Sequence, residues 1–123
     1  KERAQPVLVE GDKSLENQLI SKNILKGITA TCGGFYAPQG RKLRLTPSDS
    51  KFLKSLQNFT FEGFKITNFE METSAIFGLS KLLGHQACSM NAILANRTNG
   101  TFSNSPEKTI DALIQYTLDK LID

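Results

Sequence analysis

Apolar residues recur along this chain with two spacings, one of three to four residues, typical of helices, and one of two, typical of strands. The first predicts a helix after Asp12, whose side chain can cap it, with an apolar face of Leu15, Leu19 and Ile20. Segment 24–32 is rich in residues that favour a sheet and is broken by Gly33 and Gly34, so we expect a strand there. A long polar loop follows to about residue 44.

Helix and strand signals recur in the middle of the chain. The run Thr46-Pro47-Ser48-Asp49 predicts a helix start, followed by an apolar stripe of Phe52, Leu53 and Leu56. We expect segment 59–65 to be irregular and segment 66–69 to be short and extended. The helical rhythm is clearest over residues 71–83, and Gly84 ends it.

The last third of the chain predicts one strand and one helix. Segment 87–95 is apolar apart from Ser89 and Asn91, which is typical of a strand buried on both faces. A polar loop over 96–104 leads to a helix that starts at Ser105-Pro106-Glu107. Its inward stripe would be Ile110, Leu113, Ile114, Leu118 and Leu121. We therefore expect residues 1–123 to form part of one α/β domain, layered α/β/α with a partial mixed sheet flanked by helices.

Composition narrows the functional classes. The chain has 123 residues, 39% of them hydrophobic and 22% charged, as in an ordinary globular protein. The net charge is +3, and only Arg41, Lys42 and Arg44 crowd together, which speaks against a nucleic-acid partner. No apolar run reaches the roughly 20 residues that span a bilayer, so we expect no membrane partner.

The chain ends, the two cysteines and the single histidine add little to the expected functional class. The chain begins with Lys1 and carries no signal-peptide segment, which favours a fragment or a processed product. Cys32 and Cys88 lack metal-ligand spacing and suit free thiols in a reducing, cytoplasmic compartment, with a disulfide as the alternative. A single His gives no support to a metal site.

Two carboxylates frame Met71 where an extended segment is expected to become a helix. A carboxylate only accepts hydrogen bonds and can take two side by side, which matches the vicinal hydroxyls of ribose. Glu70 and Glu72 are therefore candidates for holding a sugar. The alternative is that both are first-turn acids that favour the positive end of the helix dipole.

The loop after the first predicted strand can hold a flat, polar base. Phe35 can lie against a ring, Gln39 offers both a donor and an acceptor, and Arg41 is a fixed cationic fork. The alternative is a solvated surface loop. Arg97 follows the predicted buried strand, and loops after strands are where ligands bind in open α/β sheets. It is a candidate for closing over the base, or equally a surface arginine.

These residues, in this order, resemble the uridine phosphorylases of the nucleoside phosphorylase family. The matching run comprises Gly27-Ile28-Thr29, Phe35-Tyr36, Gln39, Arg41, Phe69-Glu70-Met71-Glu72 and Asn96-Arg97-Thr98. Members of this family are about twice as long, so the resemblance implies the C-terminal half of such an enzyme. The phosphate site would then lie in the other half, and the isolated chain would be inactive. The resemblance also implies a homo-oligomer.

The resemblance implies a role for each matching residue. Arg41 and Gln39 would bind the uracil edge, and Phe35 would pack against sugar and base. Glu72 would take the ribose hydroxyls beside Met71, with Glu70 nearby, so that Arg41 and Glu72 carry the catalysis. Leu94 and Ala95 would line the base pocket, and Arg97 would belong to a mobile loop over it.

The implied reaction is phosphorolysis of uridine to uracil and ribose 1-phosphate, with inorganic phosphate as co-substrate and no cofactor. Asn96 favours a pyrimidine, since purine-preferring relatives usually carry an Asp near that place. The alternatives are a related nucleosidase, a purine nucleoside phosphorylase, and a non-catalytic nucleoside-binding or assembly module.

Overall fold

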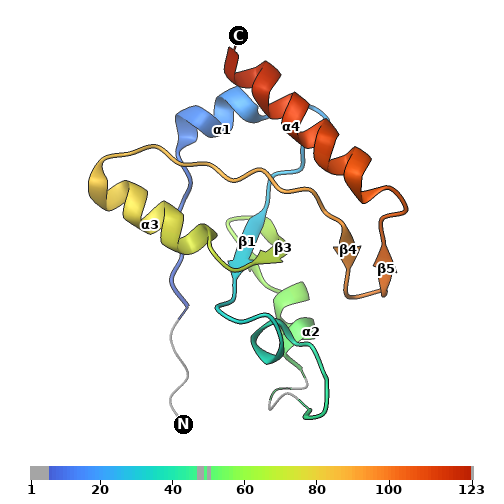
Figure 1. Cartoon of the computed structure of the whole chain (residues 1–123). Helices are drawn as coiled ribbons and strands as arrows, with labels where there is room; N and C mark the ends of the chain where they lie inside the picture. Colours follow the sequence, from blue (N-terminus) through green and yellow to red (C-terminus); the bar gives the residue numbers. More distant parts are fainter. Residues whose placement is uncertain (1–5, 47–48, 50, 123) are drawn as a thin grey trace.

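The computed structural model describes residues 6–46, 49 and 51–122. Four α-helices and five short strands follow one another along these residues (Figure 1). In chain order they are α1 (Lys13–Leu19), β1 (Ile28–Thr31), the 3-10 helix η1 (Ala37–Gln39), α2 (Phe52–Gln57), β2 (Thr60–Phe61), β3 (Phe64–Glu70), α3 (Thr73–Leu83), β4 (Ala95–Asn96), β5 (Thr101–Phe102) and α4 (Pro106–Ile122).

The central feature is a mixed three-stranded sheet in the order β1-β3-β2. β1 and β3 are parallel, with Thr29 opposite Asn68 and Thr31 opposite Glu70. The Thr29 hydroxyl donates to the Asn68 side-chain oxygen at 3.0 Å. Because the strands are parallel, their carboxyl ends meet at one edge of the sheet. The α/β class and the partial mixed sheet are confirmed.

The segment expected to be irregular, 59–65, is instead a β-hairpin. β2 pairs antiparallel with β3, and Glu62 and Gly63 form the turn between them. Their φ angles are 48° and 82°, and two positive values in succession mark the primed turn that suits a two-residue hairpin. Gly63 therefore marks a turn between strands rather than a break in regular structure.

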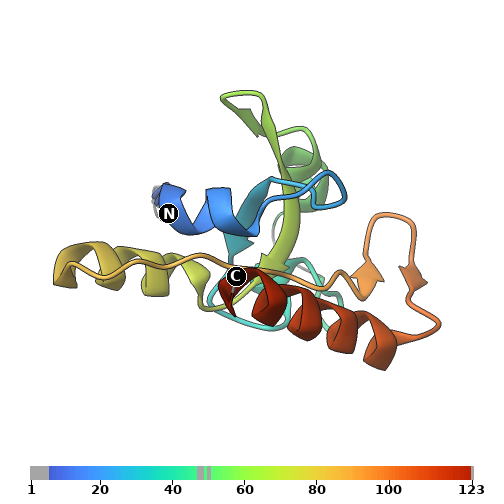
Figure 2. The same cartoon turned by 90° about the horizontal axis from the view of Figure 1, so that it is seen from above.

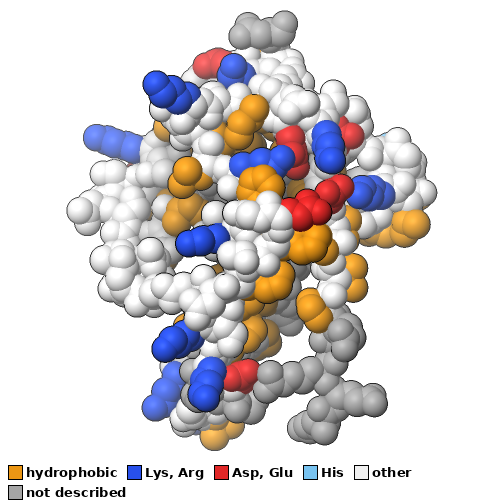
Figure 3. All heavy atoms as spheres, turned by 180° about the vertical axis from the view of Figure 1, so that it is seen from behind, with side chains coloured by type: hydrophobic (Ala, Val, Ile, Leu, Met, Phe, Trp, Pro, Cys, Tyr) orange, Lys and Arg blue, Asp and Glu red, His pale blue; other side chains and the backbone are white. Residues whose placement is uncertain are grey.

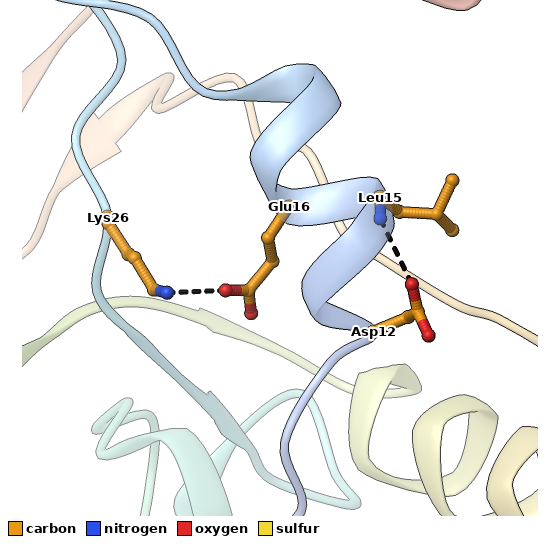
Figure 4. A network of polar contacts seen from close by, with 4 residues as sticks. All are labelled: Asp12, Leu15, Glu16 and Lys26. Atoms are coloured by element: carbon orange, nitrogen blue, oxygen red, sulfur yellow. Dashed lines mark hydrogen bonds and ion pairs between the residues drawn. The ribbon is translucent and has the colours of Figure 1, made fainter.

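Local signals place the helices well. Asp12 caps α1 by accepting the Leu15 N–H at 3.0 Å (Figure 4). Glu16 of α1 forms an ion pair with Lys26, which lies in the connection between α1 and β1. α3 ends at Gly84, whose φ of 75° is left-handed. α4 begins at Pro106 as predicted. Pro47 and Ser48, at the predicted start of the second helix, lie outside the described residues, and α2 itself begins at Phe52.

The predicted buried strand over 87–95 is wrong. Residues 87–94 form an extended connection that runs from α3 across the molecule to β4 (Figure 1). Only Ala95 enters a strand, in the small hairpin of β4 and β5, and Ile93 is 53% exposed. A strand exists through a ladder of hydrogen bonds to a neighbouring strand, and no strand of the described residues pairs with 87–94. Two isolated main-chain hydrogen bonds reach the ends of the segment, from Asp12 to the Ala87 carbonyl and from Ser103 to the Leu94 carbonyl, both at 2.7 Å.

Packing among the described residues is open. Leu19, 5% exposed, is the one buried apolar side chain there. α1 lies against α4, where the Tyr116 hydroxyl donates to the Leu19 carbonyl at 2.7 Å, while α3 projects away from the sheet (Figure 2). The predicted inward stripe of α4 is largely uncovered, since Ile114 is 51% and Leu118 is 48% exposed. No described helix is long and apolar enough to cross a bilayer.

Candidate functional site

The candidate residues gather at the carboxyl ends of β1 and β3. The loop over 33–41 leaves β1 there, and α3 leaves β3 there. The β4–β5 hairpin reaches the same place, because the Arg97 guanidinium carbon lies 5.5 Å from the centroid of the Phe69 ring in β3. This sheet edge is where open α/β sheets bind ligands.

Gln39 is the centre of the polar cluster. It is the last residue of η1 and is 3% exposed. Its Oε1 accepts from Arg41 Nη1 at 2.9 Å and from Arg97 Nη2 at 2.6 Å. Arg97 Nη1 also donates to the Gln39 main-chain oxygen at 2.7 Å. Two arginines from distant parts of the chain thus converge on one amide.

Arg41 is folded back onto its own loop. Its guanidinium carbon lies 3.6 Å from the centroid of the Phe35 ring, and Nη1 donates to the Phe35 carbonyl as well as to Gln39. This contact combines stacking with attraction between a cation and a ring. Phe35 remains 51% exposed, with the Tyr36 ring edge-on at 5.2 Å. Gln39, Arg41 and Phe35 therefore lie together, as the sequence predicts for a base site.

No acid in the part of the chain that the structure describes forms an ion pair with this cluster. Among the described residues, neither Arg41 nor Arg97 has a carboxylate within ion-pair distance. Burial lowers the pKa of Arg97, and the positive charge of Arg41 lowers it further. Arginine nevertheless stays protonated in proteins. Two cations on one neutral oxygen make this part of the surface suited to an electron-rich or anionic group.

Glu70 already has partners for its carboxylate. Oε1 accepts from the Thr31 hydroxyl at 2.5 Å, and Oε2 accepts the N–H groups of Glu72 at 2.7 Å and Thr73 at 2.6 Å. Burial alone raises the pKa of Glu70, but these hydrogen bonds outweigh it and hold the pKa below its ordinary value. Glu70 thus caps the amino end of α3, in line with the dipole alternative.

Glu72 is differently placed. It is the residue before α3, it is exposed, and its carboxylate accepts a single N–H, from Met71 at 3.2 Å. Most of its acceptor capacity is open to solvent, and Met71 beside it is 39% exposed. Of the two acids, Glu72 is the one free to take a diol.

Leu94 and Ala95 lie where 87–94 meets β4. The Leu94 carbonyl accepts the Ser103 N–H at 2.7 Å, and Ala95 pairs with Phe102. Leu94 is half-buried and Ala95 is exposed. Both are close in sequence to Arg97, but neither is a hydrogen-bond partner that the structure gives Gln39 or Arg41 among the described residues.

Sequence reasoning missed Thr31 and Cys32. The Thr31 hydroxyl donates to Glu70 and accepts the Ser74 N–H at 3.0 Å, so it links β1 to the start of α3. The Cys32 N–H donates to the Glu70 carbonyl at 2.9 Å. Burial raises the pKa of the Cys32 thiol, the positive charge of Arg97 lowers it and the charge of Glu70 raises it. The register of β1 on β3 places Thr31 opposite Glu70, and nothing in the sequence of β1 alone indicates that register.

The described residues contain no group of three His, Cys, Asp or Glu side chains able to hold a metal ion. The polar groups that meet at the site are two guanidiniums, an amide, carboxylates and hydroxyls. They can bind a polar ring, a sugar diol and developing negative charge.

Comparison with known proteins gives one partial match. The uridine phosphorylase of Thermococcus kodakarensis (strain ATCC BAA-918 / JCM 12380 / KOD1) is 34% identical to this chain over 82 residues. The match takes in 67% of this chain but spans only 29% of that protein's length. No family model matches the chain. No solved structure matches it either. The similarity supports a relationship to nucleoside phosphorylases.

Proposed function

We propose that this chain supplies the base and ribose sites of a pentosyltransferase that splits uridine with inorganic phosphate. The observation that carries the proposal is the convergence of Arg41 and Arg97 on the buried Gln39, with no acid of the described residues within ion-pair distance of either arginine. The partial similarity to a uridine phosphorylase supports it. Uracil is flat and polar, and it becomes anionic as it leaves the sugar.

In the proposed reaction a phosphate oxygen forms a bond to the anomeric carbon while the bond from that carbon to uracil N1 breaks. The electron pair goes to uracil, which takes a proton from water, and ribose 1-phosphate remains. Negative charge grows on the uracil ring in the transition state, and Arg41 beside Gln39 stabilises it. Donors fixed in advance at the place of growing charge are worth several kcal/mol in enzymes, about 3 kcal/mol each.

Glu72 holds the ribose in this proposal. Its carboxylate accepts from the 2′- and 3′-hydroxyls and keeps the anomeric carbon in line with phosphate. Met71, half-exposed beside it, packs on the sugar face. Glu70 does not touch the sugar in this proposal. Its hydrogen bonds fix the start of α3 and thereby the position of Glu72.

A phosphate-dependence assay tests the reaction. The matched region of the Thermococcus uridine phosphorylase is replaced by this chain, and release of base from uridine, inosine and methylthioadenosine is followed with and without phosphate. We expect uridine to be the best substrate and phosphate to be required. Equal turnover of uridine without phosphate indicates a nucleosidase, and preference for inosine indicates a purine phosphorylase. Binding of nucleosides without turnover indicates a non-catalytic module.

Arg41→Ala tests the base site in the same hybrid. We expect turnover of uridine to fall about a hundredfold, because a donor aimed at the developing charge is lost. Lys42→Ala is the matched control, since Lys42 is the exposed cationic neighbour. Thermal unfolding of both variants separates activity from stability. Unchanged turnover in folded Arg41→Ala contradicts the assignment of the uracil site.

A further inference from the structure

We propose that Asn99 is a site of spontaneous deamidation, in which the main-chain nitrogen of Gly100 attacks the side-chain amide of Asn99. The substrate is the chain's own amide, and the co-reactant is water. Both residues lie in the turn of residues 97–100, which joins β4 to β5. Deamidation of this kind is independent of the proposed function and needs no ligand.

The chemistry has two steps and involves no oxidation or reduction. The Gly100 nitrogen loses its proton to hydroxide and forms a bond to the Asn99 side-chain carbon, and the bond from that carbon to the amide nitrogen breaks, which leaves a cyclic imide. Water then opens the ring at either of its two carbonyl carbons. One opening gives aspartate, and the other gives isoaspartate, in which the main chain runs through the former side chain. One water is consumed, and the amide nitrogen leaves as ammonia, which takes up the proton that the new acid releases.

The main-chain nitrogen of Gly100 is accessible for this attack. Gly100 has a φ of 68°, a left-handed value that favours glycine. Apart from its chain neighbours, no atom lies within 4 Å of the place that a Cβ would occupy. Its N–H donates to no residue that the structure describes, whereas the N–H groups of Thr98 and Asn99 in the same turn donate to Asn96 Oδ1. The attacking atom is therefore neither shielded by a side chain nor held by an oxygen of the described residues.

The side-chain amide of Asn99 is held and polarised beside this nitrogen. Its Oδ1 accepts the Thr101 hydroxyl at 2.8 Å. Thr101 follows Gly100, so this contact reaches past Gly100 and keeps the amide near its main chain. A hydroxyl that donates to the carbonyl oxygen stabilises the negative charge that grows there as the nitrogen attacks. Asn99 is exposed, so water and hydroxide reach it.

The other asparagines of the chain lack this combination, since none of them precedes a glycine. Asn96 lies in the same hairpin and precedes Arg97, and its side-chain oxygen is already occupied by two main-chain N–H groups. Asn104 is exposed as well, but the N–H of the residue after it donates to Ser103 Oγ at 3.2 Å. These two asparagines therefore serve as internal controls for Asn99.

Deamidation changes both the charge and the backbone of the hairpin. It lowers the formal net charge of +3 by one. Isoaspartate also lengthens the main chain by one carbon, in a turn that only the two residue pairs of β4 and β5 hold closed. We expect these pairs to loosen, and with them the contact of Arg97, which begins the turn, to Gln39.

Peptide mapping by mass spectrometry tests the inference on the whole chain, kept folded in mildly alkaline buffer for several days. The mass gain of an acid over an amide is followed at each asparagine, and labelling by an isoaspartyl methyltransferase measures isoaspartate. We expect Asn99 to convert at least about tenfold faster than Asn96 or Asn104, a difference of about 1.4 kcal/mol in the barrier, and to give isoaspartate as well as aspartate. The rate should rise with pH, because the deprotonated nitrogen attacks. Equal rates at the three asparagines, or a product without isoaspartate, overturn the inference.

Substitutions in and near the turn check each partner of the reaction. Asn99→Gln has to close a larger ring, so we expect no mass gain at this position, and Asn104→Gln is the matched control that leaves the rate at Asn99 unchanged. Thr101→Val keeps a β-branched side chain in β5 but removes the hydroxyl. We expect it to slow conversion of Asn99 at least about threefold, the effect of one lost hydrogen bond. An unchanged rate in Thr101→Val overturns the role of the hydroxyl.

Hydrogen exchange tests the effect on the hairpin. In the aged wild-type chain we expect faster exchange at the Ser103 N–H, which donates to the Leu94 carbonyl at 2.7 Å beside the paired strands. Aged Asn99→Gln should exchange as slowly as it does when fresh. Equal exchange in aged and fresh wild type overturns the loosening of the hairpin, whereas the mass gain decides the modification itself.

Discussion

Glu70 and Glu72 lie two residues apart, yet their carboxylates face different partners. Glu70 accepts three hydrogen bonds from Thr31, Glu72 and Thr73, whereas Glu72 accepts one. Acids of this kind are hard to separate by sequence, since both suit the first turn of a helix. The hydrogen-bond geometry assigns Glu70 to capping and leaves Glu72 for a ligand.

Paired substitutions test this division. Glu70→Gln should lower the free energy of unfolding by about 1 kcal/mol, because a charged cap of α3 is lost. Glu72→Gln should change it by less than about 0.5 kcal/mol, as at an exposed site, and should weaken nucleoside binding. Urea unfolding and calorimetric titration measure the two effects. Equal losses of stability in both variants contradict the division.

Acid sensitivity gives a second test of Glu70. Its pKa is lower in the folded chain than its ordinary value of 4.5, so the folded state holds the carboxylate ionised more strongly than the unfolded chain does. The resulting stability is present above the unfolded pKa and is lost as the pH falls through the lower folded pKa. Urea unfolding between about pH 7 and pH 3 should show a smaller loss in Glu70→Gln than in the wild type. If the free energy of unfolding depends on pH in the same way in both proteins, Glu70 does not contribute this stability.

At the scale of elements, the β2–β3 hairpin carries a mismatch between residue and backbone. Glu62 sits at a φ of 48°, which a glutamate adopts at some cost and an asparagine adopts readily. Glu62→Asn should therefore raise the free energy of unfolding by about 0.5–1 kcal/mol. Gly63→Ala, at a φ of 82°, should lower it by about 1 kcal/mol or more. Urea unfolding of both variants is the measurement, and a destabilised Glu62→Asn contradicts the turn.

At the scale of the whole molecule, the accessible surface is too large for the mass. It is 9887 Å², whereas a compact monomer of this 13.6 kDa mass has roughly 6,600 Å². Hydrophobic side chains are visible across the middle of the face in Figure 3. Exposed apolar side chains that gather on one face are typical of a surface that packs against other protein or binds a ligand.

We expect the isolated chain to bind an apolar fluorescent dye at neutral pH and to associate as its concentration rises. The physical reason is the uncovered stripe of α4, where Ile114 and Leu118 are about half exposed. Ile114→Lys with Leu118→Lys should reduce both effects while circular dichroism stays unchanged. Sedimentation and dye fluorescence measure them. A chain that stays monomeric and binds no dye contradicts this expectation.

The sequence by itself determined the helices and the kinds of residue at the site. Asp12, Gly84 and Pro106 mark helix ends because capping and backbone conformation act over a few neighbouring residues. The same locality explains why Phe35, Gln39 and Arg41 could be grouped from their place in one loop, and the structure brings the three together.

Only the tertiary structure decided which distant residues meet. Arg97 reaches Gln39 across 58 positions, and Thr31 reaches Glu70 through the register of two parallel strands. For the same reason segment 87–94 has the composition of a buried strand but is not one, since no strand of the described residues pairs with it. Composition is a property of the segment, whereas pairing and burial depend on what the rest of the chain places beside it.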